Sequence, residues 1–167
     1  MLADHLRGVF PDQKITQFDD IVRVELRDRD HLYATTGPLV DGHNVGFVLQ
    51  GTPGDEAVHR ETLTMVAFYH ASGGSFALDH GHTVPIGRPW VLGSRCDHLL
   101  VSLPYPWGPT LETADFPGGH LRLLWLLPIT KAEKSFRHEH GLEALEQRFD
   151  EAELLYADPY RKCVVAG

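Results

Sequence analysis

A His-x-His pair is the feature of this sequence that comes closest to a chemical site. His80 and His82 flank Gly81, and on a strand two side chains at this spacing point to the same face, where two imidazoles can share a metal ion. A working site needs at least one more ligand. The candidates are His70, His98, His120 and the segment 139–140. One hypothesis is therefore a metal-binding protein or metal-dependent hydrolase that uses His80 and His82.

The alternative is structural: Gly81 permits a tight turn, and the two histidines hydrogen-bond to the backbone or stay exposed. We favour this alternative and expect neither a metal ion nor another cofactor. A second pair, His138 and His140, has the same spacing, but on a helix its side chains project about 200° apart, which prevents shared chelation.

Nucleophilic catalysis is not indicated either. No serine lies in a Gly-x-Ser-x-Gly elbow. Cys96, Asp97 and His98 are consecutive, and adjacent residues do not normally converge as a triad. The sequence therefore predicts a protein that is not an enzyme.

Aromatic residues give a different kind of candidate. Tyr105 and Trp107 lie in a proline-rich segment, 104–109, and Trp90 follows Pro89. Aromatic side chains on a rigid loop bury much apolar area at little entropic cost, so they are common in interaction hot spots. The alternative is that these rings fold inward and cap the sheet. The candidate partner-binding residues are Tyr105, Trp107, Trp90, His80 and His82.

Length and composition bound the class of protein. The 167 residues, with 43% hydrophobic and 23% charged content, fit a single domain over 1–167. The net charge of −8 disfavours nucleic acid as a partner and favours a basic protein. The two cysteines lack a metal or disulfide spacing, and no apolar run approaches the about 18 residues of a membrane span. We expect a cytoplasmic protein that does not bind membranes.

The elements that must position these residues follow from hydrophobic periodicity. A short helix is expected before Pro11, and alternation predicts strands over 22–26, 32–36 and 45–51. Turn signals at 37–38 and 41–42 separate the second and third of these strands. A helix is expected over about 56–70, with Asp55 as N-cap and Gly73-Gly74 as a stop, although Thr62, Thr64 and Val66 also fit alternation.

The second half of the chain carries stronger signals. The segments 99–103 and 121–127 are short, almost continuously apolar runs, as expected for central strands covered on both faces. Thr130 and Glu133 have the spacing of a capping box, which predicts a helix from near Lys131. Gly141 is expected to interrupt it before a further helical segment with Leu142 and Phe149 on its apolar side. Together these elements indicate an α+β domain with a mixed or largely antiparallel sheet packed by helices.

Several short motifs occur in a fixed order. They are Gly81-His82-Thr83, the apolar run 99–103, Leu126-Leu127-Pro128-Ile129, the capped helix with Glu133, and Gly141-Leu142-Glu143-Ala144-Leu145. Their order and spacing resemble the suppressor of fused family, in particular its compact bacterial members, across about residues 45–165. The first forty residues match less clearly.

The resemblance implies a single α+β domain that acts by binding. Eukaryotic members bind and restrain transcription factors in Hedgehog signalling through an extended peptide, and bacterial members are suspected immunity proteins that neutralise toxins. This chain is far shorter than the eukaryotic members, so Hedgehog-type regulation is not expected. The expected function is a non-enzymatic protein-binding domain whose partner is a protein or extended peptide, in one version a basic toxin, and the oligomeric state stays open.

Overall fold

The structure, a computed structural model, describes residues 1–37 and 43–165. The strands are β1 (Ile15–Phe18), β2 (Ile21–Glu25), β3 (His31–Thr36), β4 (His43–Gly51), β5 (Thr83–Pro85), β6 (Cys96–Ser102), β7 (Thr113–Phe116) and β8 (Gly119–Thr130). The α-helices are α1 (Leu2–Val9), α2 (Glu56–Ala71), α3 (Pro109–Glu112), α4 (Lys131–His140) and α5 (Leu142–Glu151). Two 3-10 turns, η1 (Gly74–Phe76) and η2 (Tyr105–Trp107), complete the set.

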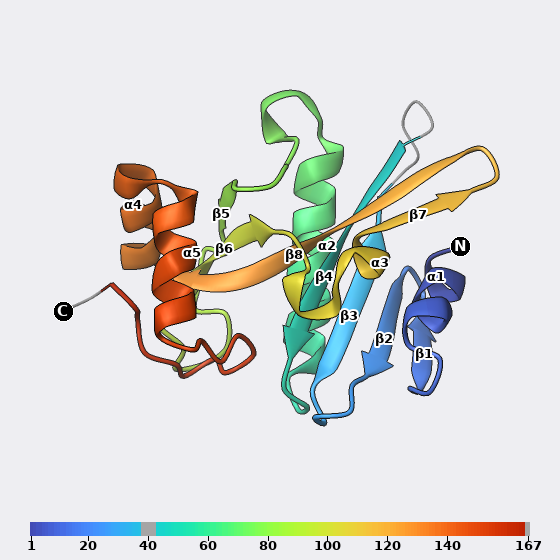
Figure 1. The fold of residues 1–167 in the computed structure, drawn as a ribbon, viewed down its shortest axis with the longest axis horizontal. Helices are drawn as coiled ribbons and strands as arrows, with labels where there is room; N and C mark the ends of the chain where they lie inside the picture. Colours follow the sequence, from blue (N-terminus) through green and yellow to red (C-terminus); the bar gives the residue numbers. More distant parts are fainter. Residues whose placement is uncertain (38–42, 166–167) are drawn as a thin grey trace.

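One sheet organises the molecule, with the strand order β1-β2-β3-β4-β8-β6-β5 (Figure 1). β4 and β8 run parallel, and the other pairings of the described strands are antiparallel. The long strand β8 joins two halves: its first part pairs with β4 and β7, and its last part pairs with β6. The expected mixed, largely antiparallel α+β fold is confirmed.

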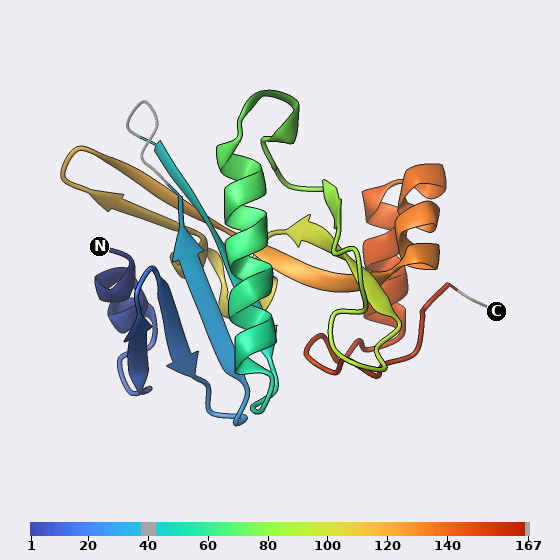
Figure 2. The same cartoon turned by 180° about the vertical axis from the view of Figure 1, so that it is seen from behind.

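Apolar side chains of the central strands alternate between two cores. Along β8, Leu123, Trp125 and Leu127 face the core that includes α1 and α5, while Leu124 and Leu126 face the core that includes α2. Figure 2 shows α2 lying across β3 and β4 on its own face of the sheet. Because both faces of β8 are covered, its sequence reads as a continuous apolar run, as the sequence predicted.

The expected strands and helices that rested on clear periodicity are confirmed. The helix before Pro11 is α1, the 56–70 segment is helical as α2, and the capped segment is α4. Asp55 stands at the N-cap of α2, but its side chain makes no capping hydrogen bond. The turn signals at 38 and 41–42 lie outside the described residues. In the described ranges no helix is long and apolar enough to cross a membrane.

The capping box at the start of α4 is present in full. Thr130 Oγ1 accepts a hydrogen bond from the backbone N–H of Glu133 over 3.1 Å, and Glu133 Oε1 accepts one from the Thr130 N–H over 2.8 Å. Gly141, with φ at +93°, ends the helix and starts α5. The two helices lie together at the end of the molecule opposite α1 (Figure 1).

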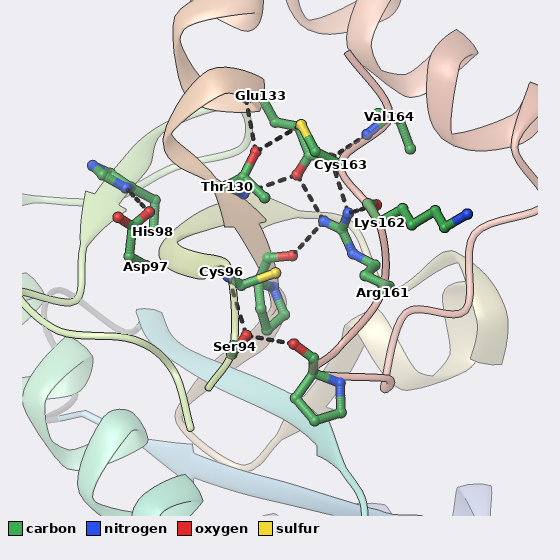
Figure 3. A network of polar contacts seen from close by, with 12 residues as sticks. Ser94, Cys96, Asp97, His98, Thr130, Glu133, Arg161, Lys162, Cys163 and Val164 are labelled. Atoms are coloured by element: carbon green, nitrogen blue, oxygen red, sulfur yellow. Dashed lines mark hydrogen bonds and ion pairs between the residues drawn. The ribbon is translucent and has the colours of Figure 1, made fainter. Parts of the chain in front are cut away.

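A buried polar network fastens the C-terminal segment under these helices (Figure 3). The guanidinium of Arg161 donates to Glu133 and to the carbonyl oxygen of Pro128, and Glu133 also accepts from the Val164 N–H. Ser94 donates to the carbonyl oxygen of Pro159. This network anchors residues 159–164 to β8 and the start of α4, and the C-terminal segment 154–165 also supplies one wall of the cavity described below.

Candidate protein-binding site

The two histidines of the His-x-His pair have different surroundings. Gly81 lies between them with φ at +93°, so the segment does not follow regular strand alternation. The ring Nδ1 of His82 accepts a hydrogen bond from the Asp79 N–H over 3.1 Å. His80 turns to α5, where its Nε2 lies 3.8 Å from Glu146 Oε1.

The proposed third ligands are engaged elsewhere. His70 accepts from the Leu78 N–H, and His98, His120 and His140 contact Asp97, Asp115 and Glu139, respectively. Within the described residues no group of three His, Cys, Asp or Glu side chains is arranged to hold a metal ion. No observation in the described structure therefore favours the metal hypothesis for His80 and His82.

Cys96 is not placed as a nucleophile. Its side chain lies in the core, and burial raises the pKa of its thiol, which favours the unreactive protonated form. The neighbouring His98 contacts Asp97, and the bulge between Cys96 and His98 shifts the register of β6. The three consecutive residues do not form a triad.

The three candidate aromatic residues differ in accessibility. Trp90 is 1% exposed and belongs to the α2 core, where it contacts His59. Trp107 is half-buried and packs edge-on against Trp125 at 5.5 Å between ring centroids. Tyr105 is 56% exposed. In this structure Tyr105 is available to a partner, whereas the ring of Trp90 is not.

A cavity of about 330 Å³ lies beside Tyr105, between α5 and the face formed by β6 and β8. Its apolar lining comes from two strands, one turn, one helix and the C-terminal segment. The lining side chains of this kind are Leu100, Tyr105, Trp125, Leu127, Phe149 and Tyr156. Ser102 adds a hydroxyl group. We call this site the α5 cavity.

Aromatic rings support one another in the α5 cavity. The rings of Trp125 and Tyr156 meet edge-on at 4.8 Å between centroids, and Trp107 also packs edge-on against Trp125. Edge-to-face pairs of this kind are favourable beyond their buried area. The aromatic wall is therefore a fixed surface, with Tyr105 at its exposed side.

Two carboxylates, Glu146 and Asp150, complete the lining. They lie four residues apart on α5 and so occupy the same helix face. Burial raises the pKa of Glu146, the carboxylates of Asp150 and Glu143 add to this shift, and His80 opposes it. Glu146 Oε1 is shielded from solvent and has no hydrogen-bond partner. The cavity thus combines an aromatic wall with concentrated negative charge.

Glu146, Asp150 and Tyr156 were not among the residues predicted from the sequence, although one signal was present. Like charges at i and i+4 on a helix repel each other, so two acidic residues directly after the buried Leu145 and Phe149 depart from a pattern that stability alone would favour. The convergence of this pair with Tyr105 was not predictable, because the lining comes from elements distant in the sequence.

Comparison with known proteins decides the family. The model of the family described as suppressor of fused protein (SUFU) matches residues 40–162. The chain belongs to the suppressor of fused family.

Solved structures of SUFU proteins share its fold. A Neisseria gonorrhoeae protein described as a SUFU homologue is 31% identical, with a TM-score of 0.82 over 99% of this chain and 96% of that one. The fold therefore extends through the first forty residues. A chain of the Sufu-Fu complex matches at a TM-score of 0.68 and 15% identity, covering 98% of this chain and 90% of that chain.

Drosophila Suppressor of Fused matches at a TM-score of 0.65 and 13% identity, and the match covers 98% of this chain but 50% of that chain. The SUFU-family chain thus spans about half the length of the Drosophila protein. No curated protein sequence matches this chain.

Proposed function

We propose that this SUFU-family chain is a non-enzymatic protein-binding domain whose partner is a basic protein or an extended basic peptide. One observation carries the proposal: over 98% of its length, the chain has the fold of a chain in the Sufu-Fu complex. Fold likeness alone does not determine function. The surface of this chain supplies the rest of the support.

Charge and shape agree with such a partner. The net charge is −8, and complementary charge accelerates association with a basic protein. The α5 cavity offers a concave surface with the exposed Tyr105 at its side, and buried aromatic anchors in pockets provide most of the affinity in typical interfaces. His80 and His82 lie in the segment before β5, and His80 reaches α5.

The biological version that we favour is a bacterial immunity protein that neutralises a toxin in the cytoplasm. The likeness to the Neisseria gonorrhoeae protein supports a bacterial origin. Both cysteines are free, which suits a reducing compartment. An acidic chain would cover a basic toxin by charge complementarity and rapid association.

Co-expression with the products of adjacent genes tests this proposal. We expect one product to co-purify with the chain in a stoichiometric complex, and its toxicity to cells to disappear when the chain is present. Association should slow steeply as salt rises, because the encounter is steered by charge. The proposal fails if no adjacent product binds and purified chain captures no protein from cells of its source.

A further inference from the structure

We propose that the α5 cavity binds the positively charged side chain of a lysine or arginine of the partner, an inference that rests on the proposed protein-binding function. The cavity lies between α5 and the β6–β8 face, and its volume of about 330 Å³ stands at the lower end of the range for ligand pockets. A space of this size suits one long side chain rather than a large cofactor.

The charge of the cavity is negative and poorly compensated. Glu146 and Asp150 line it, and the lining contains neither lysine nor arginine. His80 is the basic side chain nearest to Glu146 in the described contacts, at 3.8 Å, beyond direct hydrogen-bond distance. Glu146 Oε1 has no hydrogen-bond partner, and Asp150 adds an exposed carboxylate to the same lining, to which an ammonium or guanidinium group would bind.

Burial and the same negative charge together raise the pKa values of the two tyrosines that line the cavity. Burial raises the pKa of Tyr156, and Asp150 and Glu146 raise it further. Burial also raises the pKa of Tyr105, with added contributions from Glu146 and Glu112. An additional negative charge is therefore disfavoured at each of these groups, and an incoming cation would relieve the repulsion.

The aromatic wall favours an organic cation over a metal ion. Tyr105, Trp125 and Tyr156 present rings to the cavity, and cations are attracted to aromatic faces. The aliphatic stem of lysine or arginine would pack against Leu100 and Leu127 while its charged end reaches the carboxylates. Hard metal ions instead prefer a shell of oxygen ligands, and the aromatic rings and aliphatic side chains of this lining supply none.

A blocked five-residue peptide with a central lysine provides a direct probe, and the same peptide with norleucine is its neutral control. We expect the lysine peptide, titrated into the ¹⁵N-labelled full chain, to shift the indole N–H signal of Trp125 and the backbone signals of α5 saturably. The norleucine peptide should bind at least about tenfold more weakly, because a hydrogen-bonded charge contributes about 1.4 kcal/mol or more.

Two sets of variants locate the effect. Glu146→Gln with Asp150→Asn should weaken lysine-peptide binding at least about tenfold. Glu139→Gln with Glu151→Gln removes the same charge from exposed positions outside the cavity lining and should leave binding within about twofold. Tyr105→Ala, at a largely exposed position, should also weaken binding while the chain stays folded.

Equal binding of the two peptides, equal loss in both charge variants, or no shift at Trp125 would overturn the proposal. Two further outcomes separate the cavity assignment from the proposed protein-binding function. If the co-purified partner binds the Glu146→Gln/Asp150→Asn chain as tightly as the native one, the cavity assignment is wrong and the protein-binding function stands. If the lysine peptide binds as described and no partner exists, the proposed function alone is wrong.

Discussion

The guanidinium of Arg161 forms a two-pronged ion pair with the carboxylate of Glu133, over 2.7 Å from Nη2 to Oε1 and 2.9 Å from Nη1 to Oε2. Both residues are buried, and the contact joins the C-terminal segment to the first turn of α4. Tyr156 lies in the same segment and lines the α5 cavity. The ion pair therefore anchors the segment that carries Tyr156.

Removing one partner of this pair should strongly destabilise the chain. Arg161→Met leaves Glu133 as a buried charge without its partner, and we expect the free energy of unfolding to fall by about 3–5 kcal/mol in urea titrations. Arg7→Met breaks the exposed pair with Asp4 and should change the free energy of unfolding by less than about 0.5 kcal/mol. Equal effects of the two substitutions would contradict the assigned role.

Stability should depend on pH through His59. Burial lowers the pKa of this histidine from 6.5 to about 4. Between pH 6.5 and pH 4, His59 therefore binds a proton in the unfolded chain but not in the folded chain. Stability should be fully present above pH 6.5, decrease by up to about 3 kcal/mol as the pH falls to 4, and lose nothing further from this group below that.

The variant His59→Leu isolates this contribution. Urea titrations at a series of pH values should show a smaller stability loss between pH 6.5 and 4 in His59→Leu than in the native chain. His138→Leu, at an exposed position, should keep the native pH profile. A native profile in His59→Leu would show that His59 is not the titrating group.

Much of the fold was predictable because its strongest elements carry local signals. The capping box of Thr130 and Glu133 marks the start of α4, and the alternation of Val22 and Val24 marks β2. The short strands β1, β5 and β7 were missed. Each has three or four residues, and such strands are defined by long-range pairing, as when Thr113 aligns with Arg122, rather than by periodicity.

Close packing of β4 against β3 should make Gly46 intolerant of a side chain. A Cβ atom there would lie 2.3 Å from the backbone oxygen of Thr35, so Gly46→Ala forces the strands apart and should lower stability by about 1–3 kcal/mol. Gly8→Ala, on α1 with open space around it, should instead raise stability by up to about 1 kcal/mol. Thermal unfolding of both variants checks the opposite signs.

The two aromatic residues of η2 should separate stability from binding. Trp107→Ala removes the ring that packs on Trp125 and should cost about 2 kcal/mol or more of folding free energy. Tyr105→Ala, at a site 56% exposed, should cost less than about 0.5 kcal/mol yet weaken partner binding. Chemical denaturation and titration with the lysine peptide measure the two effects, and a severe folding defect in Tyr105→Ala would remove it as a docking residue.

The functional site was less predictable than the fold. The pair His80 and His82 attracted attention by spacing alone, and the positive φ of Gly81 sends the two rings to different partners. The carboxylates of Glu146 and Asp150 form a candidate site only together with the aromatic rings of the same cavity. No local sequence pattern predicts that these rings lie there. Chemistry concentrated in one segment is visible in a sequence, whereas a cavity assembled from distant segments is not.

Binding of the partner identified by co-expression, measured by calorimetry for the native chain and the Glu146→Gln/Asp150→Asn variant, tests the protein-binding role most directly. We expect a stoichiometric complex with the native chain and at least about tenfold weaker binding by the variant, while Glu139→Gln/Glu151→Gln binds as the native chain does. Failure of the native chain to bind any adjacent gene product or any protein from its source cells would contradict that role.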